Sequence, residues 1–161
     1  MITRTAIIIS VWLGMLAPVQ AQQVSAIYKI GNLLNRVNNS DTCYVVNFWA
    51  TWCKPCVEEL PGFDSATVLL KNKPVKVLLV CLNFSDEIKT KVNPFLKSKG
   101  VRSECILLDE INGNDFVNKV SDRWSGAIPA TWFVKGEVRE LSERKIKLSE
   151  ILSRVETLLN K

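Results

Sequence analysis

The hydrophobic positions of the chain fall into short blocks separated by polar turns, a pattern that predicts alternating strands and helices. In several blocks β-branched and aromatic residues fill consecutive positions, as in strands with both faces buried. The last two blocks flank Lys135-Gly136-Glu137, which predicts a hairpin. The predicted strands are residues 43–49, 75–84, 105–108, 131–134 and 138–141.

Apolar residues at three- and four-residue spacing predict the helices. Pro61-Gly62 falls inside the helical segment 56–70, and we expect a kink or break there. Ser85-Asp86 is expected to cap a helix that ends at Lys99-Gly100, where glycine suits the left-handed closing position. The other predicted helices cover residues 27–37, 115–124 and 148–159. Together these elements predict a mixed α/β sheet in a single domain over residues 22–161.

The first 21 residues have the features of a secretory signal peptide. Arg4 precedes an apolar run over residues 6–17, and the small residues Val19 and Ala21 are spaced for cleavage. We therefore expect a mature chain that starts near Gln22 and an exported, periplasmic protein. The alternative is an uncleaved membrane anchor, although the run is shorter than the roughly 20 residues that a span needs.

Composition excludes several kinds of chemistry. The chain has no histidine, which removes Ser-His and Cys-His catalysis, and its lone CxxC motif supplies too few ligands for zinc. We therefore expect no metal and no cofactor. The net charge of +5 becomes +4 without Arg4, and the lysines are scattered among acidic residues, so we expect no nucleic-acid binding.

The CxxC motif directly follows a predicted strand, which places Cys53 at the first turn of the next helix. Unpaired backbone N–H groups and the helix dipole stabilise a thiolate there, and Lys54 should lower the pKa of Cys53 further. Pro55 is tolerated because its missing N–H falls among those already unpaired. We expect Cys53 to attack a substrate disulfide and Cys56, one turn inward, to resolve the mixed disulfide. The alternative is a purely structural disulfide, although so small a loop stabilises a fold least.

The motif has a recognisable context. The block Val45-Val46-Asn47-Phe48-Trp49-Ala50-Thr51-Trp52-Cys53-Lys54-Pro55-Cys56 resembles the thioredoxin superfamily, and within it the exported TlpA/ResA-type thiol–disulfide oxidoreductases. The resemblance runs from about Tyr44 to the C-terminus and is strong again at Gly126-Ala127-Ile128-Pro129-Ala130-Thr131. It implies a thioredoxin-like α/β fold with a mixed sheet of about five strands, flanked by helices on both faces.

The resemblance also implies roles for individual residues around the motif. It implies a cis peptide bond before Pro129, beside the cysteines, and backbone groups of Ile128 that meet the substrate strand. Trp49 is expected to be a packing wall, and Trp124 to lie in the core or at its rim. The residues expected to bind substrate are Trp52, Lys54, Pro55, Ile128 and Pro129.

Two further positions concern the proton chemistry of the cysteines. Asn47 stands where classical thioredoxins keep a buried Asp, as in the TlpA-like group, and it cannot exchange a proton. Glu59 matches the glutamate that ResA-type proteins place near the cysteines, which implies a modulator of cysteine pKa values and a proton acceptor for Cys56. The alternative is a solvated helix glutamate, and the neighbouring Glu58, facing elsewhere, is the control.

Three cysteines depart from the pattern: Cys43, Cys81 and Cys105. The total of five is odd, so at least one thiol is free or joined to another chain. Cys43 starts its predicted strand whereas Cys81 is late in its own, and this stagger argues against a bridge between them. We expect buried, inert thiols. A less favoured idea gives Cys81 a part in redox transfer.

These features favour a monomeric disulfide reductase that acts on exported proteins and receives electrons from a membrane donor. Strong oxidants of the superfamily often have histidine between the two cysteines, and Lys54-Pro55 lacks it. Cytochrome c maturation is one role known in the branch, and general repair of exported thiols is another. The alternative from a different class is a non-catalytic thioredoxin-like binding module whose cysteines form a structural disulfide.

Overall fold

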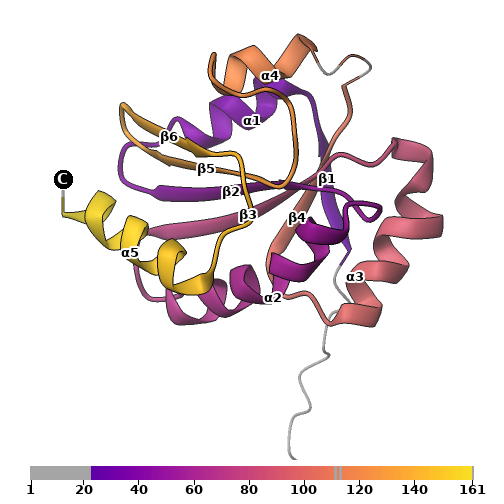
Figure 1. The fold of residues 1–161 in the computed structure, drawn as a ribbon, viewed down its shortest axis with the longest axis horizontal. Helices are drawn as coiled ribbons and strands as arrows, with labels where there is room; N and C mark the ends of the chain where they lie inside the picture. The colour runs from indigo at the N-terminus through magenta and orange to yellow at the C-terminus, as the bar shows by residue number, and fades with distance from the viewer. Residues whose placement is uncertain (1–22, 111, 113, 161) are drawn as a thin grey trace, which may run out of the picture.

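A mixed sheet forms the centre of the computed structural model, which describes residues 23–110, 112 and 114–160 (Figure 1). The described residues form one six-stranded sheet in the order β1-β4-β3-β2-β5-β6. The strands from β1 to β2 in that order are parallel, and β5 and β6 add an antiparallel hairpin. The strands are β1 (Val24–Tyr28), β2 (Cys43–Trp49), β3 (Val75–Cys81), β4 (Glu104–Leu108), β5 (Ala130–Lys135) and β6 (Val138–Ser142).

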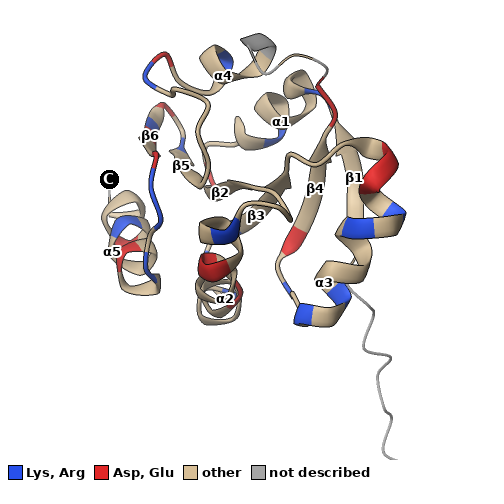
Figure 2. Cartoon of the chain, turned by 45° about the vertical axis from the view of Figure 1, so that its right-hand side comes forward, with Lys and Arg blue, Asp and Glu red and all other residues tan. Residues whose placement is uncertain are grey.

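Helices cover both faces of this sheet (Figure 1). One face packs against α1 (Ile30–Val37) and α4 (Asn114–Val120). The other packs against α2 (Lys54–Leu69), α3 (Asn93–Lys99) and α5 (Leu148–Leu159). Charged residues are interspersed over the helices and loops, whereas the central strands are largely free of them (Figure 2). The expected α/β fold with helices on both faces is confirmed, and no helix of the described segments is long and apolar enough to cross a membrane.

The central strand β2 is buried along its whole length, which fixes the position of the segment that follows it. Because side chains alternate along a strand, Val45 and Trp49 pack on the α2 side while Val46 and Phe48 pack on the α1 side. Each fully buried side chain of this size contributes about 1.5–3 kcal/mol. The strand is therefore a rigid base for the loop that carries Cys53.

The N-terminal part of the fold differs from the sequence prediction. A sixth strand, β1, pairs in parallel with β4, and the first helix begins at Ile30 rather than Ile27. The side chains of β1 alternate between half-buried and exposed, because it is an edge strand, and Ile27 points outward. The predicted signal peptide, residues 1–21, lies outside the described residues.

The helices that follow the two central strands also differ in detail. Pro61 lies inside α2 without ending it, because its ring is exposed while Leu60 and Phe63 anchor the helix in the core. The strand expected to reach Phe84 ends at Cys81 as β3. It leads into a short 3₁₀ turn (Ser85–Glu87), a π-helical turn (Ile88–Val92) and then α3.

The predicted ends of the later helices are partly right. The expected cap at Ser85-Asp86 is wrong, because Phe84 precedes the 3₁₀ turn and no side chain caps it. Gly100 closes α3 with φ 61°, as predicted. Helix α4 ends at Val120 instead of Trp124. Trp124 is a core residue whose ring lies 4.6 Å from that of Phe48, and its Nε1 donates to Ala127 O at 2.8 Å.

Candidate active site

Cys53 and Cys56 are joined by a disulfide at the start of α2. The strand β2 ends at Trp49, a turn follows, and Cys53 is the N-cap residue of the helix. The N–H of Cys53 donates to Ala50 O at 3.2 Å, and the carbonyl of Cys53 accepts the first helical bond from Val57 at 3.0 Å. Cys53 is 6% exposed and Cys56 is fully buried. The two sulfurs therefore differ in access, with Cys53 on the outer side.

The residues between the cysteines face solvent. Lys54 and Pro55 are both exposed in the first helical turn, and that turn carries no acidic side chain. The positive end of the helix dipole, its unpaired N–H groups and the Lys54 ammonium all favour a negative charge on Cys53. This is the electrostatic setting of a nucleophilic thiolate. Trp52, just before the motif, is 67% exposed.

The segment that precedes β5 forms one wall of the site. Because β5 runs antiparallel beside β2, its start lies next to the end of β2. The Ile128–Pro129 peptide bond is cis, Pro129 is buried and Ile128 is half-buried. Cys53 Sγ lies 3.8 Å from the Ile128 carbonyl oxygen. The structure thus brings together Cys53, Cys56, Ile128 and Pro129.

Glu59 is a buried residue of the helix that begins at the cysteines. It is one helical turn beyond Cys56, so the two side chains share a face of α2. Its Oε1 accepts a hydrogen bond from Asn47 Nδ2 at 2.7 Å, and its Oε2 accepts one from the Ile146 N–H at 2.9 Å. Burial raises the pKa of Glu59, and these two hydrogen bonds oppose the rise. A solvated glutamate, the alternative interpretation, does not fit this burial.

Glu58, the adjacent residue, is exposed and points elsewhere. Its Oε2 lies 2.7 Å from Lys145 Nζ, and this ion pair holds the pKa of Glu58 below its usual value. Asn47 donates also to Thr131 Oγ1 at 3.3 Å, while its own Oδ1 is buried without a hydrogen-bond partner. The hydrogen bond from Asn47 Nδ2 to Glu59 Oε1 joins the two buried side chains into one polar unit.

Asn83 links the loop after β3 to the loop that carries Cys53 through hydrogen bonds. The sequence pattern did not indicate a role for this residue. Its Oδ1 accepts from the Thr51 N–H at 2.9 Å, and its Nδ2 donates to Thr51 Oγ1 and to Glu87 Oε2, each at 2.8 Å. Asn83 fell inside a predicted strand, so its role was visible only once β2 and β3 were paired. The network fixes the residue two positions before Cys53.

The other three cysteines are free and fully buried. Burial raises the pKa of Cys43 to about 11 and that of Cys81 to about 12, and it raises the pKa of Cys105 well above the usual value. In the strand register Cys43 pairs with Val75, whereas Cys81 pairs with Trp49 at the opposite end. The predicted stagger between Cys43 and Cys81 is confirmed. Among the described residues no group of three or more cysteine or acidic side chains is placed to hold a metal.

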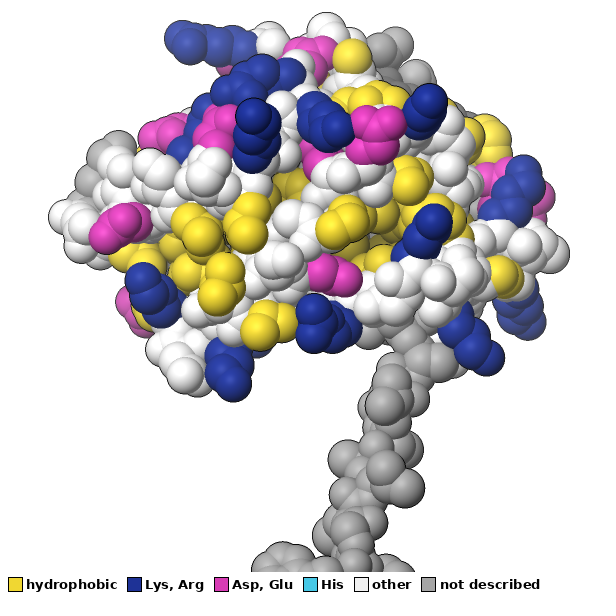
Figure 3. Space-filling model, turned by 60° about the horizontal axis from the view of Figure 1, so that its bottom comes forward, with side chains coloured by type: hydrophobic (Ala, Val, Ile, Leu, Met, Phe, Trp, Pro, Cys, Tyr) yellow, Lys and Arg dark blue, Asp and Glu magenta, His cyan; other side chains and the backbone are white. Residues whose placement is uncertain are grey.

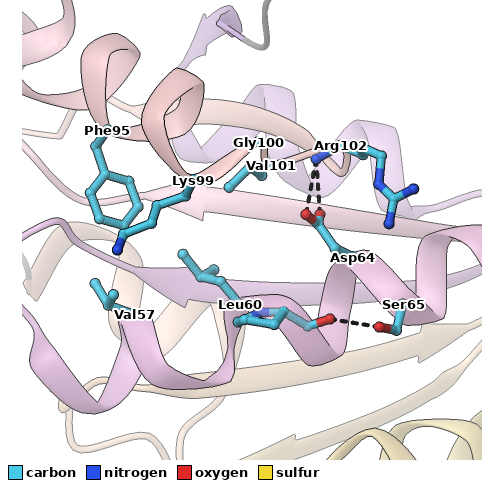
Figure 4. Close-up of a pocket in the computed structure, with 10 residues that line it drawn as sticks. Val57, Leu60, Asp64, Ser65, Phe95, Lys99, Gly100, Val101 and Arg102 are labelled. Carbon is cyan, nitrogen blue, oxygen red and sulfur yellow. Dashed lines mark hydrogen bonds between the residues drawn. The ribbon is translucent and has the colours of Figure 1, made fainter.

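A cavity of about 420 Å³ lies between α2 and α3, near the cysteines but lined by neither (Figure 4). Val57 and Leu60 form its α2 side and Phe95 its α3 side. At its far end Asp64 accepts hydrogen bonds from the Arg102 N–H, at 3.0 and 3.1 Å. On the side of the molecule seen in Figure 3, hydrophobic side chains form separate groups rather than one continuous patch.

Comparison with known proteins fits this geometry. Residues 17–142 match the family model described as Redoxin. The chain belongs to the Redoxin family. Among the chain's named relatives, the thiol-disulfide oxidoreductase ResA of Oceanobacillus iheyensis is 29% identical over 110 residues, which is 66% of this chain and 52% of that protein. ResA of Bacillus subtilis is 30% identical over 93 residues, which is 57% of this chain and 46% of that protein.

These ResA relatives confirm the TlpA/ResA-like resemblance, and the chain spans about half of their length. In fold, the chain is similar to a thioredoxin-related protein from Neisseria meningitidis serogroup B. The TM-score is 0.66 with 22% identity, over 76% of this chain and 89% of that one. The thioredoxin-like architecture is therefore shown.

Proposed function

We propose that the protein is a thiol–disulfide oxidoreductase that reduces disulfides of exported proteins through Cys53 and Cys56. The observation that carries the proposal is the pairing of an outer sulfur at a helix start with a buried sulfur one turn inward. The ResA relatives are named thiol-disulfide oxidoreductases, which supports the general class of the reaction. In this proposal Trp52, Lys54, Pro55, Ile128 and Pro129 form the surface that receives the substrate.

The reaction runs by two thiolate exchanges. In the reduced protein the Cys53 thiolate attacks one sulfur of the substrate disulfide, and the other substrate sulfur leaves as a thiolate. Cys56 then loses its proton and attacks Cys53 Sγ, which releases the second substrate thiolate and forms the Cys53–Cys56 disulfide. The substrate gains two electrons, and its two thiolates take up two protons. A dithiol donor at the membrane returns two electrons to the protein.

Glu59 serves this scheme as the proton acceptor for Cys56. A buried thiol ionises with difficulty, because burial disfavours the thiolate. Glu59 lies on the same helix face one turn away, and its raised pKa brings it closer to that of a thiol than an exposed carboxylate would be. Glu58, whose pKa is lowered beside Lys145, is unsuited to the role.

Reduction, rather than oxidation, is proposed because Lys54-Pro55 carries no histidine to stabilise the reduced form strongly. Export is proposed from the signal-peptide features of residues 1–21. In an oxidising compartment a reductase needs an outside source of electrons, which is why a membrane donor belongs to the proposal. Reduction of apocytochrome c thiols before haem attachment is one role that this chemistry suits.

Trapping with Cys56→Ser tests the proposal, because this variant stops after the first exchange. We expect a stable mixed disulfide between Cys53 and a disulfide-bonded peptide, detected by mass spectrometry after acid quenching. The matched variant Cys53→Ser should form none. Absence of any adduct with Cys56→Ser would overturn the enzyme proposal in favour of a non-catalytic binding module with a structural disulfide.

A further inference from the structure

Two aromatic rings stand out on the surface near the disulfide. Phe84 is 76% exposed and Trp52 67%, the highest values among the large hydrophobic residues of the described segments. Rings left in water cost free energy, and exposed aromatics are typical anchors of binding surfaces. The other exposed large hydrophobic residues, Ile27, Val68 and Leu69, lie on an edge strand and at the far end of α2.

The sheet order places these two rings on adjacent loops. Strand β2 lies between β3 and β5, so the loop after β2 is flanked by the loop after β3 and by Ile128–Pro129. The Leu82 N–H donates to Trp49 O at 2.8 Å, and the Thr51–Asn83 hydrogen bonds continue this pairing. Trp52 and Phe84 each follow directly after these bonded residues. The start of β5 and the ends of β2 and β3 therefore present Ile128, the Cys53 loop and Phe84 in one row.

The loop that carries Phe84 is held in place before any partner arrives. Asn83, buried at its base, bonds to Thr51 and Glu87, and Cys81 Sγ lies 3.2 Å from Asn83 Oδ1. Glu87 in turn is paired with Lys91. A fixed loop loses little conformational entropy on binding, so an exposed ring on it is ready to bind.

We propose that Phe84, together with Trp52, binds an apolar side chain of the substrate polypeptide two residues from the cysteine that Cys53 attacks. This inference rests on the proposed reductase function and deepens it by naming a substrate class: disulfides with an aliphatic or aromatic residue at that position. The row of loops continues the surface at Ile128, which is why a polypeptide in extended conformation is the expected occupant.

The spacing of the strands supports contact between Phe84 and the substrate residue two positions from the attacked cysteine. Neighbouring strands are about 4.8 Å apart, and an extended chain advances about 3.3 Å per residue. A substrate strand that crosses from Ile128 toward β3 moves from above β2 to above β3 within one or two residues. Alternate side chains point to the same side, so the residue two positions from the attacked cysteine also faces the protein and lies at Phe84.

The test is a single-turnover measurement with pre-reduced protein and two disulfide peptides. One peptide has Leu at both positions two residues from its cysteine, and the other has Ser there. We expect the wild-type protein to react about tenfold faster with the Leu peptide, as burial of a leucine side chain implies. Phe84→Ala should bring the ratio of the two second-order rate constants close to one. Leu69→Ala, which truncates another exposed hydrophobic side chain (59% exposed) at the far end of α2, should keep the tenfold ratio.

Each other outcome contradicts a specific claim. Equal wild-type rates for the two peptides, or a tenfold ratio that survives Phe84→Ala, overturns the docking surface while leaving the reductase intact. Failure of the wild-type protein to reduce either peptide or a small aromatic disulfide overturns the proposed function, and the inference with it. A concentration-dependent dimer in sedimentation that Phe84→Ala abolishes would assign the surface to a second copy of the chain instead.

Discussion

Glu59→Gln separates the proton chemistry of the site from its packing. Glutamine has nearly the same shape, and its carbonyl oxygen can accept the hydrogen bond that Ile146 N–H now donates to Glu59. Its amide can donate to Asn47 Oδ1, which has no partner, once the Asn47 amide turns over. Two hydrogen bonds lose charge assistance, about 1 kcal/mol each, and removal of a buried charge offsets that loss. The free energy of unfolding should therefore change by less than about 2 kcal/mol.

The effect on the reaction should be much larger and confined to one step. Without its proton acceptor, Cys56 should resolve the mixed disulfide roughly 100-fold more slowly, the lower range for a general base. Attack by Cys53 should keep its rate. Rapid acid quenching and mass spectrometry of a peptide reaction will show the mixed disulfide accumulating in Glu59→Gln. Glu58→Gln, the exposed neighbour, is the matched control and should resolve at the wild-type rate.

The pH dependence of the free energy of unfolding supplies a second check on the same substitution. Because the folded-state pKa of Glu59 is raised, the stability from this group is fully present below the unfolded value of about 4.3 and falls as the pH rises through the folded value. In urea unfolding, the free energy of unfolding of the wild-type protein should fall relative to that of Glu59→Gln as the pH rises from the unfolded-state pKa of Glu59 to its folded-state pKa. A parallel pH dependence of both proteins, together with an unchanged resolution rate, would refute the account of Glu59.

Two further predictions concern the buried groups around the site. Cys43, Cys81 and Cys105 should resist iodoacetamide in the folded protein and react only in denaturant, because burial raises their pKa values and denies access; native-state labelling of any of them, read by mass spectrometry, would contradict this. Asp64→Ala should lower the free energy of unfolding by about 2–3 kcal/mol in a urea titration, because the N–H groups of Arg102 and Ser103 now bonded to Asp64 lose this acceptor. A change below the error of the titration would show that water replaces the carboxylate.

The active-site chemistry was predictable because short local patterns carry it. Cys53 and Cys56 form a motif whose spacing is read along the chain, whereas Pro129 and Glu59 were expected from the resemblance to TlpA/ResA-type proteins. The buried central strand was equally clear, since β-branched and aromatic residues fill both of its faces around the single polar residue Asn47.

What the sequence did not reveal depends on contacts between distant segments. Strand β1 is short, half exposed and only weakly apolar, and Ile27 happened to fit the helical spacing of the next segment. Asn83 and Phe84 were placed within a strand because the apolar block continues past Cys81. Their importance arises from the pairing of β2 with β3, which no local pattern encodes.

The central claim is that the Cys53–Cys56 pair works as a reductant, and its reduction potential tests that claim most directly. Equilibration against defined thiol–disulfide buffers, followed by alkylation and mass spectrometry, yields the fraction of reduced protein at each potential. We predict a value near that of thioredoxin, about −270 mV. A value near that of the strong oxidant DsbA, about −120 mV, would contradict the account and make the protein a donor of disulfides.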